Sequence, residues 1–301
     1  MTAIISPKLR PILGHLVLAV VLFFLGRALY ANWEQVREYR WTFDYPLLAL
    51  SIIAVFGTLS LYAWQWKTTL NGLGVDLSFP KTFRIWFIAN LGRYVPGKVW
   101  QFVGWFYLCE REGATKVQTL TSIAINQVLQ NVMGLALAFV IFAATHSLEL
   151  KGSLLPLLVL IPLGALAIQP RIMEWTLNRA LQFLGRGPVT LGLSSLDLAR
   201  FALTHLLCWL FYGLAFYLLI KAIYPAPLGW LPAFTGIFAA AYVMGFVSLL
   251  TPGGLGVREG ALAYLLGFYL PPHVAIVISL LSRLWITAAE LIGTMIALWI
   301  K

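Results

Sequence analysis

Long apolar runs follow one another along the chain, with short polar stretches between them. A helix needs roughly 20 apolar residues to cross about 30 Å of hydrocarbon. Runs of about that length cover residues 12–30, 47–66, 119–144, 153–169, 200–221 and 273–299. The pattern predicts an all-α polytopic membrane protein with about six full spans.

Two further stretches, 83–108 and 232–270, are apolar but carry Pro-Gly near their middles. Proline removes a backbone donor and disturbs the preceding turn, while glycine permits the conformations that a tight reversal needs. We interpret each stretch as a re-entrant hairpin of two half-length helices. A simple kink, or a turn between two short spans, is the alternative. The predicted hairpin tips are Pro96 and Gly97 in the first stretch, and Pro252, Gly253 and Gly254 in the second.

The two interrupted stretches resemble each other. When Pro96 is aligned with Pro252, Gly104 also falls on Gly260. With six full spans, the two hairpins enter the membrane from opposite sides, which predicts an inverted repeat. We therefore expect one integral membrane domain, 1–301, with a first half at 1–170 and a second half at 198–301. Interrupted segments in corresponding halves of a chain are typical of a transport site at the membrane midplane.

The composition agrees with the apolar pattern, and the distribution of charge predicts how the protein is oriented in the membrane. Apolar residues make up 60% of the chain and charged residues 11%, where soluble domains average about 25% charged. The net charge of +10 does not indicate nucleic-acid binding, because the cations are spread over many loops. Twelve of them fall on one predicted side and four on the other. The bias predicts a multi-pass protein of the plasma (inner) membrane with both termini in the cytoplasm.

A few charged residues fall inside or beside apolar segments, where each costs about 2.5–3.5 kcal/mol on insertion scales. Arg283 and Glu290 share one face of the last span, about 10.5 Å apart along the axis. Since that is too far for direct contact, we expect Arg283 and Glu290 to pair elsewhere, with Glu259 and Arg93 as candidates. A buried structural ion pair is the alternative to a functional one.

The span 119–144 carries a continuous polar face. Thr119, Ser122, Asn126 and Gln130 lie within one arc of the helix, flanked by Gln127 and Asn131. Hydrogen bonding between helices would explain such a face. Because four amides within six residues exceed what packing requires, we expect the face to line a cavity.

The charges in the interrupted segments are mostly positive, which favours an anionic substrate. Arginine side chains and glycine-rich backbone amides hold phosphate well, and a lipid phosphate could enter from the bilayer. The predicted substrate-binding residues are Arg93, Lys98, Asn126, Gln130, Arg258, Glu259, Arg283 and Glu290.

Enzymatic chemistry finds little support in the sequence. Membrane transferases that act on lipid diphosphates need clustered acids to hold magnesium, whereas Asp44, Asp76 and Asp197 are far apart. The four histidines have no metal-ligand spacing. We expect no cofactor, no metal and no catalytic residue, although a substrate-assisted transferase stays open.

The segments "NLGRYVPGKVWQF", "EREGATKVQTL" and "LLTPGGLGVREGALAYLL" resemble the lysylphosphatidylglycerol synthase transmembrane-region family. That family includes the membrane portion of the multiple peptide resistance factor and stand-alone proteins. The resemblance covers roughly residues 10 to 300. It rests on Asn90, Pro96, Gly97, Lys98, Pro252, Gly253, Gly254, Gly256, Glu259 and Arg283.

The resemblance implies a flippase-like module that moves aminoacylated or otherwise modified anionic lipids between leaflets. We therefore expect a lipid transporter whose partner is a membrane lipid with a phosphate head group. The alternatives are a non-transporting accessory or scaffold subunit for neighbouring lipid-modifying enzymes, and a membrane-embedded lipid transferase. A homo-oligomer is compatible with either role.

Overall fold

The computed structural model describes residues 30, 33–94, 100–145, 169–183, 187–248 and 256–300. The predicted spans at 12–30 and 153–169 lie almost wholly outside these ranges. So do the predicted hairpin tips Pro96, Gly97, Pro252, Gly253 and Gly254, together with Lys98.

Five helical segments are long and apolar enough to cross a membrane, judged by length and composition within the described ranges. They are α3 (Tyr45–Gly72), α6 (Lys116–Thr145), α9 (Ser195–Lys221), α10 (Leu231–Val247) with the short 3-10 turn η2 (Leu228–Trp230) before it, and α12 (Pro272–Trp299). The described chain contains no strand. The predicted all-α polytopic class is confirmed.

Each interrupted stretch contains two helices separated by a break. The first comprises α4 (Phe79–Asn90), the 3-10 turn η1 (Leu91–Tyr94) and α5 (Trp100–Arg111). The second comprises α10 and α11 (Val257–Leu266). The pieces are unequal: α4 and α5 have 12 residues each and α11 has 10, whereas α10 has 17. Three pieces are therefore half-length, as predicted, but α10 together with η2 reaches the 20 residues of a full span.

Local sequence signals set where the long helices begin. The Asp44 carboxylate accepts a hydrogen bond from the Leu47 amide, 3.0 Å away, at the start of α3. At the start of α9, the Ser194 hydroxyl accepts from the Asp197 amide and the Asp197 carboxylate accepts from the Ser194 amide. These contacts satisfy amides that lack partners within the helix.

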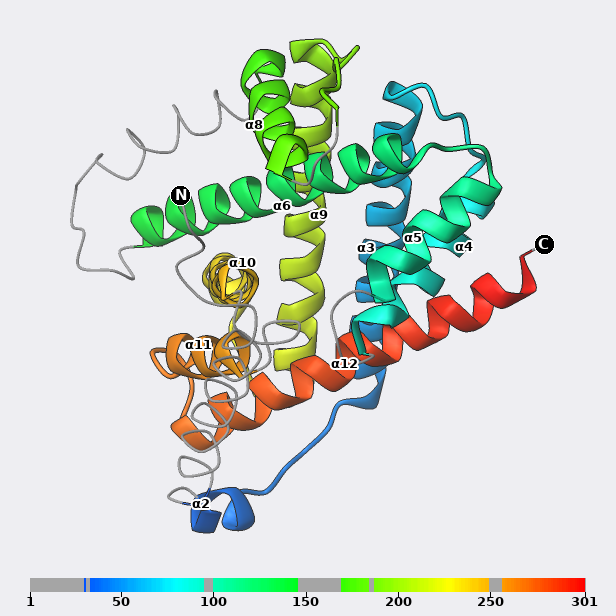
Figure 1. Ribbon diagram of the computed structural model, residues 1–301. Coiled ribbons are helices and arrows are strands. Elements are labelled where there is room, and N and C mark those ends of the chain that lie inside the picture. The colour runs from blue at the N-terminus through cyan, green and yellow to red at the C-terminus, as the bar shows by residue number, and fades with distance from the viewer. Residues whose placement is uncertain are drawn as a thin grey trace.

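The long helices α3 and α9 run antiparallel and form the centre of the bundle (Figure 1). The Asp44 amide donates to the Ala222 carbonyl, 2.8 Å away, which joins the start of α3 to the end of α9. At the other end, Gly72 lies close to Leu193 and Phe201. Helices α6 and α12 cross this pair, with α4 and α5 on one side and α10 and α11 on the other (Figure 1).

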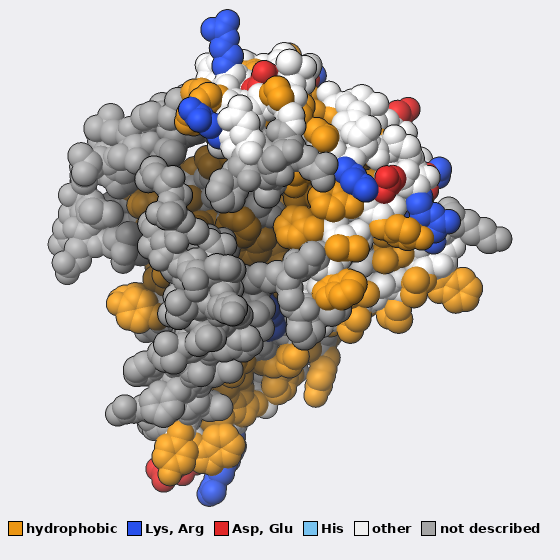
Figure 2. Space-filling view, viewed as in Figure 1, with side chains coloured by type: hydrophobic (Ala, Val, Ile, Leu, Met, Phe, Trp, Pro, Cys, Tyr) orange, Lys and Arg blue, Asp and Glu red, His pale blue; other side chains and the backbone are white. Residues whose placement is uncertain are grey.

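The two ends of the α3 and α9 pair carry the shorter amphipathic elements. Helix α2 (Trp33–Glu38) lies at the lower tip, and α8 (Pro170–Phe183) lies beside the beginning of α9. Hydrophobic side chains cover the middle of the visible face, while charged ones gather on its upper part and at the lower tip (Figure 2). This banded surface is typical of a protein that sits in a bilayer. The sequence analysis did not predict α8.

Aromatic side chains fill the core between α9, α10 and α12. Trp209, Phe216, Phe234 and Phe238 are almost completely buried. The rings of Phe216 and Phe238 have centroids 4.6 Å apart, and that of Trp285 lies 6.3 Å from each of the two. Burying such rings gives a rigid interior, against which charged side chains can be held in place.

Glycine allows α4 to approach α12 closely. A Cβ atom at Gly293 would overlap the ring of Phe87, which is itself almost fully buried. Phe87 thus occupies the space that any larger residue at position 293 would need. The contact holds the first interrupted stretch against the last span.

We predict that Gly293→Ala destabilises the protein by about 1–3 kcal/mol, because overpacking forces Phe87 to move. Gly57→Ala is the matched control, since a Cβ at Gly57 in α3 meets nothing within 4 Å. Thermal unfolding of the two purified variants in detergent measures the difference. Equal stability of the two variants would show that α4 does not dock on Gly293.

Candidate functional site

One ion pair joins the break in the first stretch to the last span. Arg93, in η1, has its Nη1 atom 3.0 Å from Oε1 of Glu290 in α12. The Glu290 side chain is 2% exposed and that of Arg93 is 33% exposed. Arg93 also donates through Nη2 to Oδ1 of Asn90, at 2.7 Å. This is the pairing that the sequence analysis predicted for Glu290.

A second charged group lies at the start of α11. The Gly256 amide donates to Oε2 of Glu259, 2.7 Å away, so this carboxylate caps the helix. The other oxygen, Oε1, lies 3.8 Å from Nη1 of Arg258 and 3.7 Å from Nη1 of Arg283. Gly256 has a φ of +84°, a conformation that glycine adopts readily. The predicted pairing of Arg283 with Glu259 is present as well.

Arg258 is enclosed by protein, with 4% of its surface exposed. Its guanidinium carbon lies 5.1 Å from the centre of the Phe238 ring. Its Nη2 atom is 3.5 Å from the Ser282 hydroxyl. The Cβ of Arg258 packs on Gly245 in α10, where a side chain would collide with it. The aromatic face and the glycine hold this arginine in a fixed position.

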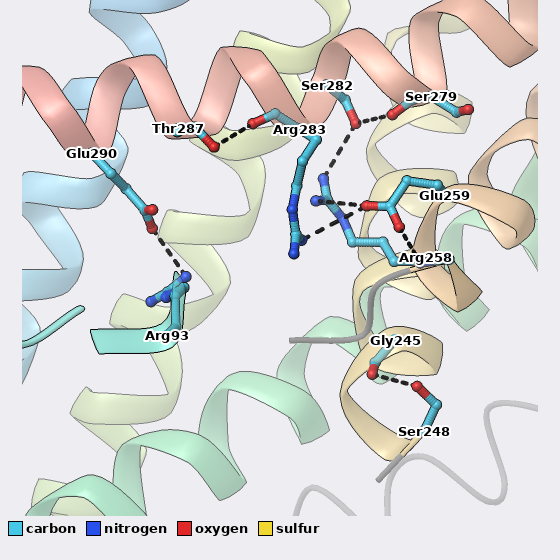
Figure 3. Close-up of polar contacts among 11 residues, drawn as sticks. Arg93, Gly245, Ser248, Arg258, Glu259, Ser279, Ser282, Arg283, Thr287 and Glu290 are labelled. Atoms are coloured by element: carbon cyan, nitrogen blue, oxygen red, sulfur yellow. Dashed lines mark hydrogen bonds and ion pairs between the residues drawn. The ribbon is translucent and has the colours of Figure 1, made fainter. Parts of the chain in front are cut away.

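Figure 3 shows the two charged groups beside α12, with Glu290 and Arg93 at one place and the Arg258, Glu259 and Arg283 group at another. The first group is balanced, but the second has two cations for one carboxylate. The distances of 3.7 and 3.8 Å are also longer than the 2.7–2.9 Å of a charge-assisted hydrogen bond. In the second group two guanidiniums therefore share one carboxylate oxygen without a short hydrogen bond to it.

A cavity of about 90 Å³ lies next to the first group. Its described walls come from α3, α4, α5, α6, α9 and α12, together with Arg93 of η1 and Tyr242 of α10. The aromatic lining residues are Tyr62, Trp66, Trp86, Trp105, Tyr212 and Tyr242. The polar lining residues are Asn90, Arg93, Gln101, Asn126, Gln127, Gln130, His205 and Glu290.

Some side chains on the polar face of α6 line the cavity, and others make hydrogen bonds inside the protein. Asn126, Gln127 and Gln130 line the cavity, as the sequence analysis expected of this face. Ser122 is fully buried instead, and its hydroxyl accepts from Nε1 of Trp66 at 2.9 Å. Thr119 is buried too and donates back to its own helix.

Several buried polar atoms on the cavity wall have no hydrogen-bond partner within the described chain. They include Nδ2 of Asn90, Nε1 of Trp105, Nε2 of Gln127, Nε2 of His205 and the hydroxyl of Tyr62. The side-chain oxygen of Asn90, Oδ1, already accepts hydrogen bonds from Arg93 and Gln101. Leaving a buried donor without a partner costs about 1–3 kcal/mol. Such a set of atoms indicates a site for a polar ligand.

The structure places seven of the eight predicted substrate-binding residues, and Lys98 lies outside the described ranges. Arg93, Asn126, Gln130 and Glu290 meet at the cavity. Arg258, Glu259 and Arg283 form the separate charged group. The sequence therefore predicted one cleft where the described residues form two neighbouring sites.

Sequence reasoning missed the aromatic half of the cavity. Trp66, Trp105 and His205 looked like ordinary residues of apolar helices, and His205 was considered only as a metal ligand. Gln101 was quoted in "KVWQF" without a role, although a glutamine in an apolar run was the available signal. In the described part of the chain, no three His, Cys, Asp or Glu side chains are grouped to hold a metal ion.

Comparison with known families gives one match that covers most of the chain. A family model described as "Lysylphosphatidylglycerol synthase TM region" matches residues 12–292. The match confirms the resemblance carried by the Pro-Gly segments. Comparison with curated proteins finds no significant match.

The unequal charge of the two groups predicts unequal effects of neutralising each glutamate. Glu259→Gln leaves the buried Arg258 guanidinium without its carboxylate, and we expect a loss of about 3–5 kcal/mol of stability. Glu290→Gln should cost less, because Arg93 is partly exposed and can turn to solvent. Glu110→Gln, at a carboxylate that is 58% exposed, is the control and should change little.

Unfolding of the three variants in detergent, by denaturant or by heat, ranks their stabilities. Equal stability of Glu259→Gln and Glu110→Gln would show that Glu259 does not stabilise the charged group at α11.

Proposed function

Because the chain belongs to the lysylphosphatidylglycerol synthase transmembrane-region family, we propose that it moves an anionic lipid between the two leaflets of its membrane. The family name connects these membrane proteins with the making of a modified phospholipid. In our proposal the protein performs no chemistry of its own and needs no cofactor. It lies in the plasma membrane with both termini in the cytoplasm.

The observation that carries the proposal is the gathering of two arginines around Glu259. The guanidiniums of Arg258 and Arg283 lie 3.8 and 3.7 Å from the same carboxylate oxygen. An anion that reached this group would find two guanidiniums close together. A phosphate is well suited, because its oxygens accept the forked donors of arginine.

Arg283 is more exposed than Arg258, so we expect the phosphate to contact Arg283 first. Its side chain is 26% exposed, whereas that of Arg258 is 5% exposed. Oε1 of Glu259 accepts no hydrogen bond from either arginine. A phosphate can therefore compete with Glu259 for Arg283 without first breaking a hydrogen bond between these two side chains. The acyl chains would stay in the bilayer while the head group is held.

Helix α12 can transmit the effect of phosphate binding from α11 to η1 in the first half of the protein. Arg283 and Glu290 lie on the same helix, one facing α11 and the other facing η1. A phosphate that draws Arg283 away from Glu259 weakens the ionic contact between α12 and α11. Differential binding of this kind can shift the balance between two arrangements of the halves. We propose that the shift carries the head group across.

Reconstituted transport tests the proposal. We expect purified protein in proteoliposomes to speed the movement of fluorescent phosphatidylglycerol between leaflets, followed by dithionite quenching. Arg283→Ala should slow this movement at least about tenfold, since a hydrogen bond to a charged group contributes about 1.5–3 kcal/mol. Arg93→Ala should slow it as well, because it removes the ion pair that joins η1 to α12.

Arg200→Ala is the matched control, because its side chain is 68% exposed at the start of α9. Monodisperse gel-filtration profiles would establish that every variant is folded. A wild-type protein that moves no anionic lipid faster than empty liposomes would favour the accessory or scaffold role. Transport that survives both substitutions would place the lipid path elsewhere.

A further inference from the structure

The cavity beside Arg93 has a chemistry of its own, which differs from that of the charged group at α11. Arg93 and Glu290 are the charged residues among its described lining, and they are paired with each other. The wall therefore has no excess charge to offer a phosphate. What it offers instead is a set of neutral hydrogen-bonding atoms between aromatic rings.

Three of the unpartnered atoms are donors: Nδ2 of Asn90, Nε1 of Trp105 and Nε2 of Gln127. Asn90 and Trp105 are at least nine-tenths buried. An occupant that satisfies them must carry several acceptor oxygens. An ammonium group carries donors alone, so it cannot bond to these atoms.

His205 adds an acceptor to this set. Its Nδ1 atom lies 2.8 Å from the Phe201 carbonyl, and a carbonyl only accepts, so Nδ1 carries the proton. In the neutral ring, Nε2 is then an acceptor, and it has no partner in the described chain. The occupant must therefore donate as well as accept. Hydroxyl groups do both, whereas a phosphate diester only accepts.

The aromatic walls and the volume of the cavity further limit which chemical group can occupy it. Trp66 and Trp105 have ring centroids 6.1 Å apart and an interplanar angle of 42°. Nε1 of Trp66 is occupied by Ser122, which fixes that ring. Rigid aromatic faces suit the C–H face of a polyol or sugar ring. A volume of about 90 Å³ is well above the roughly 10–15 Å³ that one water needs, so the cavity has room for a polar group larger than water.

We propose that this cavity binds the neutral, hydroxyl-rich part of a lipid head group, a monosaccharide or a polyol joined to the lipid through phosphate. The inference rests on the proposed function, with the phosphate at the arginines and the hydroxylated substituent in the cavity. The protein then selects lipids by two features, one charge and one neutral group. Lipids with a bare phosphate or an amine head group satisfy only the first.

Binding measurements with four probes that share a citronellyl tail test this directly. Their head groups are phosphate, phosphoglycerol, phosphoglucose and phosphoethanolamine. The full-length protein is kept in a polyoxyethylene detergent, because glucoside and maltoside detergents would compete for the cavity. We expect one or both hydroxylated probes to bind at least tenfold more tightly than citronellyl phosphate. Which of the two binds more tightly identifies the head group as sugar or polyol.

The variants Trp105→Phe and Gln127→Met remove one donor each and keep the shape. Each should abolish most of the tenfold preference while leaving the affinity for citronellyl phosphate unchanged, which also shows that the variant is folded. Trp64→Phe is the control, since Trp64 is 44% exposed on α3 and does not line the cavity.

Two results would overturn the inference: phosphoethanolamine or bare phosphate binding as tightly as the hydroxylated probes, or a preference that survives both substitutions. Either result leaves the proposed transport standing if citronellyl phosphate still binds and depends on Arg283. Failure of all four probes to bind would count against the proposed transport as well as against this site.

Discussion

Glu259 is the residue on which the polar interior of this protein depends. One of its oxygens caps α11 through the Gly256 amide, and the other lies between the guanidiniums of Arg258 and Arg283. A single carboxylate thus fixes where α11 begins and offsets two cations within an apolar bundle. Because two guanidiniums gather at this one carboxylate, we propose that the interaction that stabilises the fold also serves to bind an anion.

Helix α12 connects this group to the rest of the molecule. It contributes Arg283 to the contact with α11 and Glu290 to the contact with η1, and Gly293 lets Phe87 of α4 pack against it. Both helix breaks therefore meet α12 through charged contacts, while the aromatic core surrounds them. Packed interiors adopt discrete arrangements rather than deforming smoothly. An exchange of ionic partners along α12 is therefore an economical way to couple ligand binding to movement.

The sequence predicted four of the described spans (α3, α6, α9 and α12), the helix breaks and both ion pairs because these follow from local rules. Twenty apolar residues span a bilayer, proline breaks a helix, and charges two turns apart must find other partners. The aromatic cavity could not be predicted in this way. Trp66, Trp105 and His205 come from three different helices, and their meeting depends on how those helices pack. The length of α10 was also underestimated, because its Pro232 stands in the first turn, where proline is tolerated.

Native mass spectrometry of the purified protein with its bound lipids tests the central claim, that an anionic lipid compensates the excess cation at α11. The decisive variant is Arg258→Met, which removes that cation and leaves Glu259 with Arg283 as a balanced pair. The account predicts that the wild type retains an anionic phospholipid, while Arg258→Met stays folded and loses it. Arg200→Met should retain it. An Arg258→Met protein that still carries the anionic lipid at wild-type occupancy would contradict the account.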